Sequence, residues 1–288
     1  MLKYICYNWF GTIADHALDF SRQEYAEKVG VGKLHDKTLV PDKVDSGDVI
    51  FVKTDYIYHG MFQNNYLPQI NKPFILVTGG SSYQISQGAS IDSIINSPYL
   101  IKWYCTNAPS VPEKIVPLPI GFEEPDREGG NQEVISEIRD SRTSFANKKN
   151  KILLPYHTLN TNPARTELFQ KLRSLPFVET QEEKLSFEDY LRKVDQYKFV
   201  ICLEGSGPDV HRNYEALLVD TVPINKDNVI KRLFEYYGLP GEFVDSWSIL
   251  SEEYLGQLLG RNYNTEKVSS FLDIEKHTQS IKNTKDNL

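Results

Sequence analysis

Residues 199–224 constrain the fold more than any other part of the chain, because they alternate between two kinds of regular structure over a short length. Residues 199–203 form an apolar run typical of a strand that is buried on both faces of a parallel sheet. Glycine and proline in residues 205–208 end this strand, and Asp209 is a candidate N-cap of the helix that follows. Extended structure resumes at residues 221–224. The segment therefore predicts a strand–helix–strand unit of an α/β protein.

The turn after the first of these strands brings together groups that can hold a nucleotide. In open α/β sheets ligands bind where strands end and helices begin, and the N–H groups and dipole of a helix N-terminus attract phosphate. Arg212 lies on the first helical turn, and Glu215 lies three residues later on the same side of the helix. The arginine can neutralise a diphosphate, and the neighbouring carboxylate can bind ribose hydroxyls. The donor-site residues predicted in this turn are Glu204, Gly205, Ser206, Gly207, His211, Arg212 and Glu215.

The same region resembles a known family. It reads Lys198-Phe-Val-Ile-Cys, then Gly-x-Gly-x-Asp-x-His-Arg-x-x-Glu-Ala-Leu, then Val-Pro-Ile. This pattern resembles the C-terminal signature of exostosin-like glycosyltransferases, a family that includes proteins encoded by large DNA viruses of algae. The resemblance spans about residues 186–225. Two positions depart from the family pattern, which often has a proline in place of Leu203 and a glycine in place of Asp220.

The resemblance implies a GT-B-like fold, with two Rossmann-like domains that face each other across a cleft, and an inverting transfer of a sugar to a hydroxyl. Arg212 would then stabilise the negative charge that grows on the leaving diphosphate, and Glu215 would bind the ribose. The expected co-substrate is a UDP-sugar, with xylose as the preferred sugar and GDP-fucose as the alternative donor. The expected acceptor is an oligosaccharide or a glycoprotein.

A second donor-site region follows the strand expected at residues 152–155. Arg165 lies on the next helix and is a second candidate cation for the diphosphate. His157 and Thr161 lie in the intervening loop and are candidate contacts to the donor. All three follow the end of a strand, which is the edge of a parallel sheet where ligands bind.

The N-terminal half is expected to hold the acceptor and the general base that takes the proton from the attacking hydroxyl. The candidate bases Asp15, Asp55 and His59 follow predicted strands, and Asp15 is preferred because the turn at residues 9–11 places an aromatic ring beside it. Each of these residues could instead serve as a turn or cap residue. The predicted acceptor-site residues are Trp9, Gly79, Gly80, Ser81 and Ser82.

Strands alternate with helices along both halves of the chain. In the first half, strands are expected at residues 4–8, 49–53, 74–78, 100–105 and 114–119, and helices at 20–29 and 90–95. In the second half, further helices are expected at 163–174, 187–196, 210–219, 227–237 and 251–259. The predicted domains are residues 1–142 and 143–288, with a terminal helix that packs back on the N-terminal domain.

Composition narrows the class of protein. With 288 residues, 40% hydrophobic and 25% charged, the chain is long enough for two globular domains. A net charge of −7 argues against a nucleic-acid partner. No apolar run approaches the roughly 18 residues of a membrane span, which favours a soluble protein. The three cysteines are expected to be buried thiols, as in a reducing compartment. Together these features predict a protein of the cytoplasm, which would be the host's cytoplasm if the chain is viral. No tightly bound cofactor or essential metal is expected, because no ligand motif is present.

Two other functions remain open at this point. A Rossmann dehydrogenase or methyltransferase would need a glycine-rich turn after the first strand, where residues 7–11 read Tyr-Asn-Trp-Phe-Gly. A non-catalytic carbohydrate-binding protein would keep a sugar site but would not need cations for a nucleotide. The oligomeric state is open as well.

Overall fold

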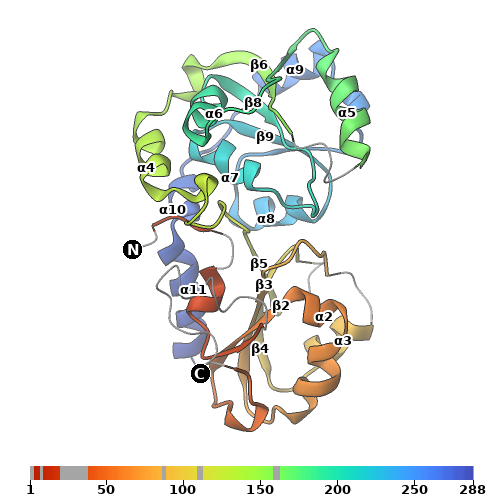
Figure 1. Cartoon of the computed structure of the whole chain (residues 1–288), viewed down its shortest axis with the longest axis vertical. Coiled ribbons are helices and arrows are strands. Elements are labelled where there is room, and N and C mark those ends of the chain that lie inside the picture. Colours follow the sequence, from red (N-terminus) through yellow and green to blue (C-terminus); the bar gives the residue numbers. More distant parts are fainter. Residues whose placement is uncertain are drawn as a thin grey trace. The chain divides into compact units, whose positions relative to one another are not determined.

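The computed structural model describes residues 3–6, 9–19, 38–85, 89–108, 113–157 and 163–287. The chain forms two compact units, shown in Figure 1. Unit 1 comprises Met1–Ile120, Glu124–Asp126 and Asp273–Leu288, and unit 2 comprises Gly121–Glu123 and Arg127–Leu272. Each unit contains one parallel five-stranded sheet. The predicted α/β class, with one Rossmann-like sheet in each half, is confirmed.

The sheet of unit 1 has its strands in chain order. They are β1 (His16–Leu18), β2 (Asp48–Lys53), β3 (Phe74–Gly79), β4 (Leu100–Thr106) and β5 (Ile115–Leu118). The central strand β3 is buried along its whole length, as expected for a run of apolar residues covered on both faces. Helices α2 (Thr54–Tyr58) and α3 (Ala89–Ile95) lie on one face of this sheet, and α11 (Ile274–Asp286) lies on the other (Figure 1).

The C-terminal helix α11 is bound to unit 1 by polar contacts as well as by packing. The hydroxyl of Tyr104 on β4 donates to the carbonyl oxygen of Ser280 at 3.0 Å and lies 2.8 Å from the hydroxyl of Thr284. The Lys285 ammonium binds the Asp15 carboxylate at 2.8 Å. Unit 1 is therefore completed by the end of the chain.

The sheet of unit 2 has the strand order β10-β9-β8-β6-β7. Its strands are β6 (Lys149–Leu154), β7 (Val178–Thr180), β8 (Tyr197–Ile201), β9 (Val222–Lys226) and β10 (Glu242–Val244). Its helices are α4 (Gln132–Ser141), α5 (Pro163–Arg173), α6 (Phe187–Val194), α7 (His211–Leu218), α8 (Val229–Tyr237), α9 (Glu252–Leu259) and α10 (Val268–Leu272). Figure 1 shows α5 and α9 on one face of the sheet and α6 and α7 on the other.

The strand order of unit 2 reverses direction between β6 and β8. From β6 the chain moves through α5 to β7 on one side, and it then returns through α6 to β8 on the other side of β6. The loops that leave the carboxyl ends of β6 and β8 are thus neighbours that lead to opposite faces. A doubly wound sheet binds its ligands at such a switch point. Unit 1, whose described strands run in chain order, has no such reversal.

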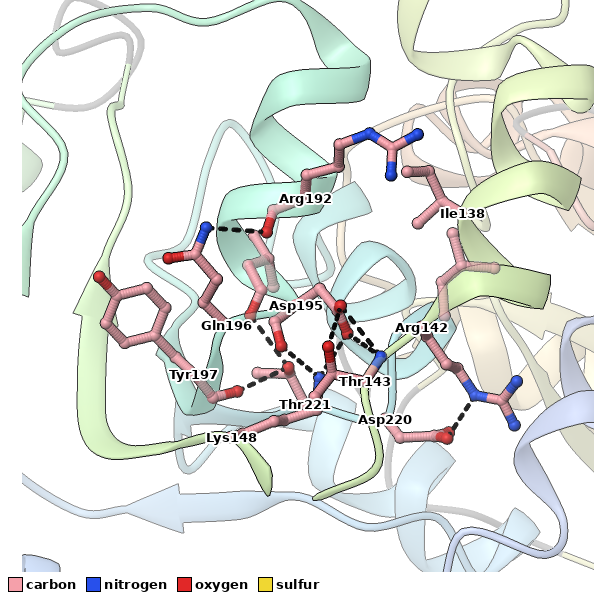
Figure 2. A network of polar contacts seen from close by, with 12 residues as sticks. Ile138, Arg142, Thr143, Lys148, Arg192, Asp195, Gln196, Tyr197, Asp220 and Thr221 are labelled. Atoms are coloured by element: carbon pink, nitrogen blue, oxygen red, sulfur yellow. Dashed lines mark hydrogen bonds and ion pairs between the residues drawn. The ribbon is translucent and has the colours of Figure 1, made fainter. Parts of the chain in front are cut away.

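The predicted domain boundary at residues 142 and 143 differs from the division seen in the structure, because α4 belongs to unit 2. Arg139 on α4 donates to the carbonyl oxygen of Leu217 at 3.4 Å and to the Asp220 carboxylate at 2.8 Å. Just beyond α4, the Thr143 amide and hydroxyl both donate to Asp195. Figure 2 shows this second contact, together with the ion pair between Lys148 and Asp195. These contacts bind α4 and the segment after it to the ends of α6 and α7 in unit 2.

Several predicted elements require correction. The strand expected at residues 4–8 is wrong over the described residues, since residues 4–6 belong to no strand and Tyr4 forms an isolated antiparallel bridge with Asp273. The first strand of the sheet is β1, which lacks the long apolar run that identifies its neighbours. The short strand β10 was also missed. The helix expected at residues 20–29 lies outside the described residues.

Candidate functional site

Arg212 lies at the switch point of unit 2, in the first turn of α7. Its Nη2 donates to the carbonyl oxygen of Tyr156 at 3.1 Å, and its Nε donates to the hydroxyl of Tyr190 at 3.1 Å. The guanidinium also lies 5.6 Å from the centre of the Tyr190 ring. No carboxylate in the described part of the chain forms an ion pair with it. A guanidinium held only by neutral acceptors keeps its full charge for an anionic ligand.

Tyr190 on α6 also binds Glu215, so a phenol separates the two motif residues. The Tyr190 hydroxyl donates to Oε2 of Glu215 at 2.9 Å while it accepts the hydrogen bond from Arg212. Burial raises the pKa of Glu215, an effect that the charge of Arg212 opposes. A direct ion pair between Arg212 and Glu215, the simplest structural role for residues with this spacing, is therefore not formed.

Arg165 on α5 connects the two loops of the switch point from the opposite side. Its Nε donates to the carbonyl oxygen of Glu204 at 3.0 Å, and its Nη2 donates to that of Leu203 at 3.1 Å. A Cβ atom added to Gly205 would lie 3.3 Å from Nη2 of Arg165, so glycine lets the turn approach the guanidinium closely. Arg165 and Arg212 thus place two cations beside the ends of β6 and β8.

His157 is a buried neutral imidazole that is affected by the charges of both cations. Its Nδ1 lies 2.6 Å from the carbonyl oxygen of Pro155. A carbonyl oxygen can only accept, so Nδ1 carries the proton and Nε2 of the neutral ring is an acceptor. Nε2 is buried and has no hydrogen-bond partner among the residues that the structure describes. Burial, with the charges of Arg212 and Arg165, lowers the pKa of His157 to about 2. A ligand hydroxyl is the kind of group that this nitrogen lacks.

The remaining donor-site residues have mixed surroundings. Nδ1 of His211 lies 2.7 Å from the carbonyl oxygen of Gly121, so this nitrogen is occupied by the backbone. The Glu204 carboxylate accepts from Asn228, the N-cap of α8. Ser206 is exposed and Gly207 is half-buried, in the turn before α7. Thr161 lies outside the described residues.

The cap predicted for the motif helix is wrong. Val210 occupies the N-cap position of α7 and makes no side-chain hydrogen bond there. The buried carboxylate of Asp209 instead accepts from Asn213 and from the hydroxyl of Tyr214. It therefore fixes the first turns of α7 from within.

Asp15 lies at the amino end of its strand, because β1 begins with the next residue, His16. Its Oδ2 accepts from the amide of Val49 at 2.9 Å and binds Lys285. Burial acts against ionisation, but these two donors still hold the pKa of Asp15 below its ordinary value. Ligands of parallel sheets bind at the carboxyl edge, so the position of Asp15 favours a structural role.

Asp55, His59 and the predicted acceptor loop do meet at the carboxyl edge of unit 1. Asp55 lies in α2, which directly follows β2, and His59 comes just after α2. Gly79 ends the neighbouring strand β3, and Gly80 follows it. Oδ2 of Asp55 is 3.8 Å from Nζ of Lys53. Ser81 is buried and Ser82 is exposed. Trp9, by contrast, is 2% exposed and packs near His277 of α11, so its ring is part of the core and is not an open surface.

Sequence reasoning missed Tyr190 as a site residue. It falls within the region of family resemblance but outside the glycine turn, and its hydroxyl reaches the site only because α6 packs beside α7. A lone tyrosine on an amphipathic helix carries no signal that would have identified this contact. The pairing of helices across one face of a sheet is a tertiary property.

The described residues also bear on metal-ligating groups, cysteines and apolar helices. No group of three or more His, Cys, Asp or Glu side chains in the described ranges could hold a metal ion. Cys6, Cys105 and Cys202 are free and buried, and burial raises the pKa of Cys6 and of Cys105 to about 12. Among the described helices, none has both the length and the apolar character needed to span a bilayer.

Comparison with solved structures yields distant similarity alone. No protein-family model matches the sequence, and no curated protein matches it. A solved structure described as an alpha1,3-fucosyltransferase is similar with a TM-score of 0.37 and 10% sequence identity, over 94% of this chain and 78% of that chain. We therefore base the function on the residues of this chain.

Proposed function

We propose that this chain is a nucleotide-sugar-dependent glycosyltransferase whose unit 2 binds the donor. One observation supports this more than any other: Arg212 lies at the switch point of a doubly wound sheet and forms no ion pair with a described carboxylate. A cation in that position, with Arg165 beside it, suits a diphosphate. Glu215 would bind ribose hydroxyls through its second carboxylate oxygen.

In the proposed reaction an acceptor hydroxyl attacks the anomeric carbon of the donor sugar. The bond from that carbon to the diphosphate oxygen breaks, and its electron pair remains on the diphosphate, where Arg212 and Arg165 stabilise the new charge. The hydroxyl proton passes to a base. The candidates for this base are Asp55 and His59, which lie at the carboxyl edge of the unit 1 sheet, whereas Asp15 does not. Attack opposite the leaving group inverts the anomeric configuration.

The proposed donor is a UDP-sugar, with xylose first and GDP-fucose as the alternative, and the proposed acceptor is a glycan. This choice of donor follows from the resemblance of residues 186–225 to exostosin-like enzymes. Since two guanidinium groups can neutralise the diphosphate, we also propose that the reaction needs no metal. A chelator should then leave the transfer rate unchanged.

The test is calorimetric titration of the protein with UDP and with GDP. We expect one of them to bind, and Arg212→Gln to weaken that binding by about 1.5–3 kcal/mol, roughly ten- to a hundredfold, as is typical for loss of a charged hydrogen bond. The Gln amide nitrogen reaches about the position of Nε, so it can still donate to the Tyr190 hydroxyl. Arg192→Gln is the matched control, because it removes one positive charge from the exposed side of α6, where Arg192 pairs with Glu188.

The result also separates this proposal from its alternatives. A carbohydrate-binding protein should bind neither nucleotide, and that outcome would refute the enzyme. Equal losses in Arg212→Gln and Arg192→Gln would refute the specific role of Arg212. Release of nucleotide from a panel of UDP- and GDP-sugars, measured with the wild-type protein, then identifies the donor.

A further inference from the structure

Three aromatic rings form a cluster at the carboxyl edge of the unit 1 sheet. Tyr58 ends α2, His59 follows it, and Tyr83 lies in the loop after β3. The rings of Tyr58 and Tyr83 are stacked, with centroids 4.4 Å apart and planes 5° from parallel. The His59 ring meets both of them edge-on, at 5.2 Å and 6.1 Å. We call these three residues the ring cluster.

The ring cluster stands on the surface. Tyr58 is 54% exposed and Tyr83 is 40% exposed, and they are among the large hydrophobic side chains that face solvent. Their near neighbour Tyr56, in the same helix, packs against the hydrophobic core of unit 1 instead. Stacking covers one face of each tyrosine, so the cluster offers outer aromatic faces to a ligand. Grouped aromatic exposure of this kind marks interaction sites more often than single exposed side chains do.

The surroundings of the ring cluster are polar but nearly balanced in charge. Lys53 and Asp55 lie 3.8 Å apart, so their charges offset one another. Oδ2 of Asp55 is buried without a hydrogen bond, and the Ser81 hydroxyl accepts from the amide of Tyr83 at 3.2 Å. A nucleic acid would require several cations here, and a protein partner a broader apolar area. An uncharged ligand with an apolar face and hydroxyl groups at its rim fits this combination.

A pyranose ring has that form. Its axial C–H bonds make an apolar face that can lie on tyrosine, and its hydroxyls can bind carboxylate, imidazole and serine at the edge. We propose that the ring cluster binds a pyranose unit of the acceptor glycan. This inference assigns to unit 1 a saccharide-binding site formed by Tyr58, His59 and Tyr83. That the bound saccharide is the acceptor rests on the proposed function.

The test uses the full chain in two assays. A printed glycan array identifies pyranose-containing ligands, and saturation-transfer NMR with xylotriose, maltotriose and chitotriose measures binding in solution. We expect Tyr58→Ala and Tyr83→Ala each to weaken binding about tenfold, the scale of one aromatic contact, and Tyr83→Phe to retain most of it. Tyr99→Ala is the matched control, because Tyr99 is 36% exposed in the same unit but precedes the amino end of β4.

Titration with UDP and GDP accompanies each variant and keeps the two proposals distinct. Saccharide binding that depends on Tyr58 and Tyr83, without any nucleotide binding, would support the ring cluster and refute the glycosyltransferase. Failure of every pyranose-containing glycan to bind the wild-type protein would overturn the ring cluster. The same conclusion follows if the two alanine variants and Tyr99→Ala bind saccharide equally well, even where nucleotide affinity is intact.

Discussion

At the scale of single residues, the site depends on the Tyr190 hydroxyl, which lies between the charged groups of Arg212 and Glu215 and binds both. Arg212 and Glu215 lie three residues apart in α7, a spacing that favours a direct ion pair. Tyr190 prevents that pair by accepting from one and donating to the other. The guanidinium therefore keeps its charge for a ligand, although it is held in place. A positioning residue that touches no ligand can thus determine affinity.

Replacing Tyr190 should test this spacer role. In Tyr190→Phe the ring remains but the hydroxyl is lost, so Arg212 and Glu215 can pair directly and neutralise each other. We expect the affinity for the nucleoside diphosphate to fall about tenfold, with a small change in melting temperature. Tyr197→Phe is the control, because its hydroxyl binds Glu179 instead. A larger loss of affinity in Tyr197→Phe than in Tyr190→Phe would contradict the idea.

His157 should make the stability of unit 2 sensitive to acid. Its pKa is about 2 in the folded protein, below the ordinary value of about 6.5 that applies in the unfolded chain. The unfolded state therefore binds a proton as the pH falls below about 6.5 while the folded state does not, so the stabilising contribution is present above that pH and is lost below it. Between pH 7 and pH 5 the loss is about 2 kcal/mol for this one group.

His157→Gln removes that titration but keeps a donor for the Pro155 carbonyl. We expect the free energy of unfolding, measured by hydrogen exchange at β8 amides, to fall less with acid in the variant than in the wild type. If the difference between the two proteins is the same at pH 7 and pH 5, His157 is not held neutral in the folded state.

At the scale of elements, the connection between α7 and β9 combines a left-handed residue with two ion pairs. Asp220 has a φ of 55°, in the left-handed region that glycine adopts most easily. Aspartate tolerates this conformation better than most residues. Its carboxylate accepts from Arg139 at 2.8 Å and from Arg142, and Figure 2 shows the Arg142 contact. The backbone strain is thus offset by two ion pairs.

This balance gives a prediction with a definite sign. Asp220→Gly relieves about 1 kcal/mol of backbone strain but leaves Arg139, whose side chain is 8% exposed, without its carboxylate. We expect a net loss of about 2 kcal/mol in the free energy of unfolding, and a similar or larger loss in Asp220→Asn. Urea denaturation measures both. A glycine variant as stable as the wild type would show that the ion pairs contribute little.

The same elements show what could be predicted from the sequence. Arg212 and Glu215 were placed correctly on the first turns of a helix after a parallel strand, because apolar runs and glycine turns are local signals. Asp15 was placed at the wrong end of its strand, because β1 has three residues and no apolar run, whereas the apolar residues 4–6 form bridges but no strand. The strand order that makes neighbours of the loops after β6 and β8 depends on long-range pairing, which one sequence does not reveal.

At the scale of the whole molecule, unit 1 is built from both ends of the chain. Helix α10 ends at Leu272 in unit 2, and α11 begins at Ile274 in unit 1, with Asp273 as its N-cap. The sheet of unit 1 therefore has one face covered by the last helix of the chain, whereas all the residues of the proposed nucleotide site belong to unit 2. Stability of the first unit and nucleotide affinity of the second should respond to different substitutions.

Two core truncations test that separation. Ile281 on α11 is 1% exposed, and Leu258 on α9 in the core of unit 2 is fully buried. Each change to alanine should cost about 2–5 kcal/mol through lost contacts and a cavity. Hydrogen exchange should therefore accelerate at β3 amides in Ile281→Ala and at β8 amides in Leu258→Ala, while Ile281→Ala binds the nucleotide with wild-type affinity. If Ile281→Ala instead weakens nucleotide binding as much as it destabilises β3, the two units do not act independently, and the donor site requires unit 1 as well.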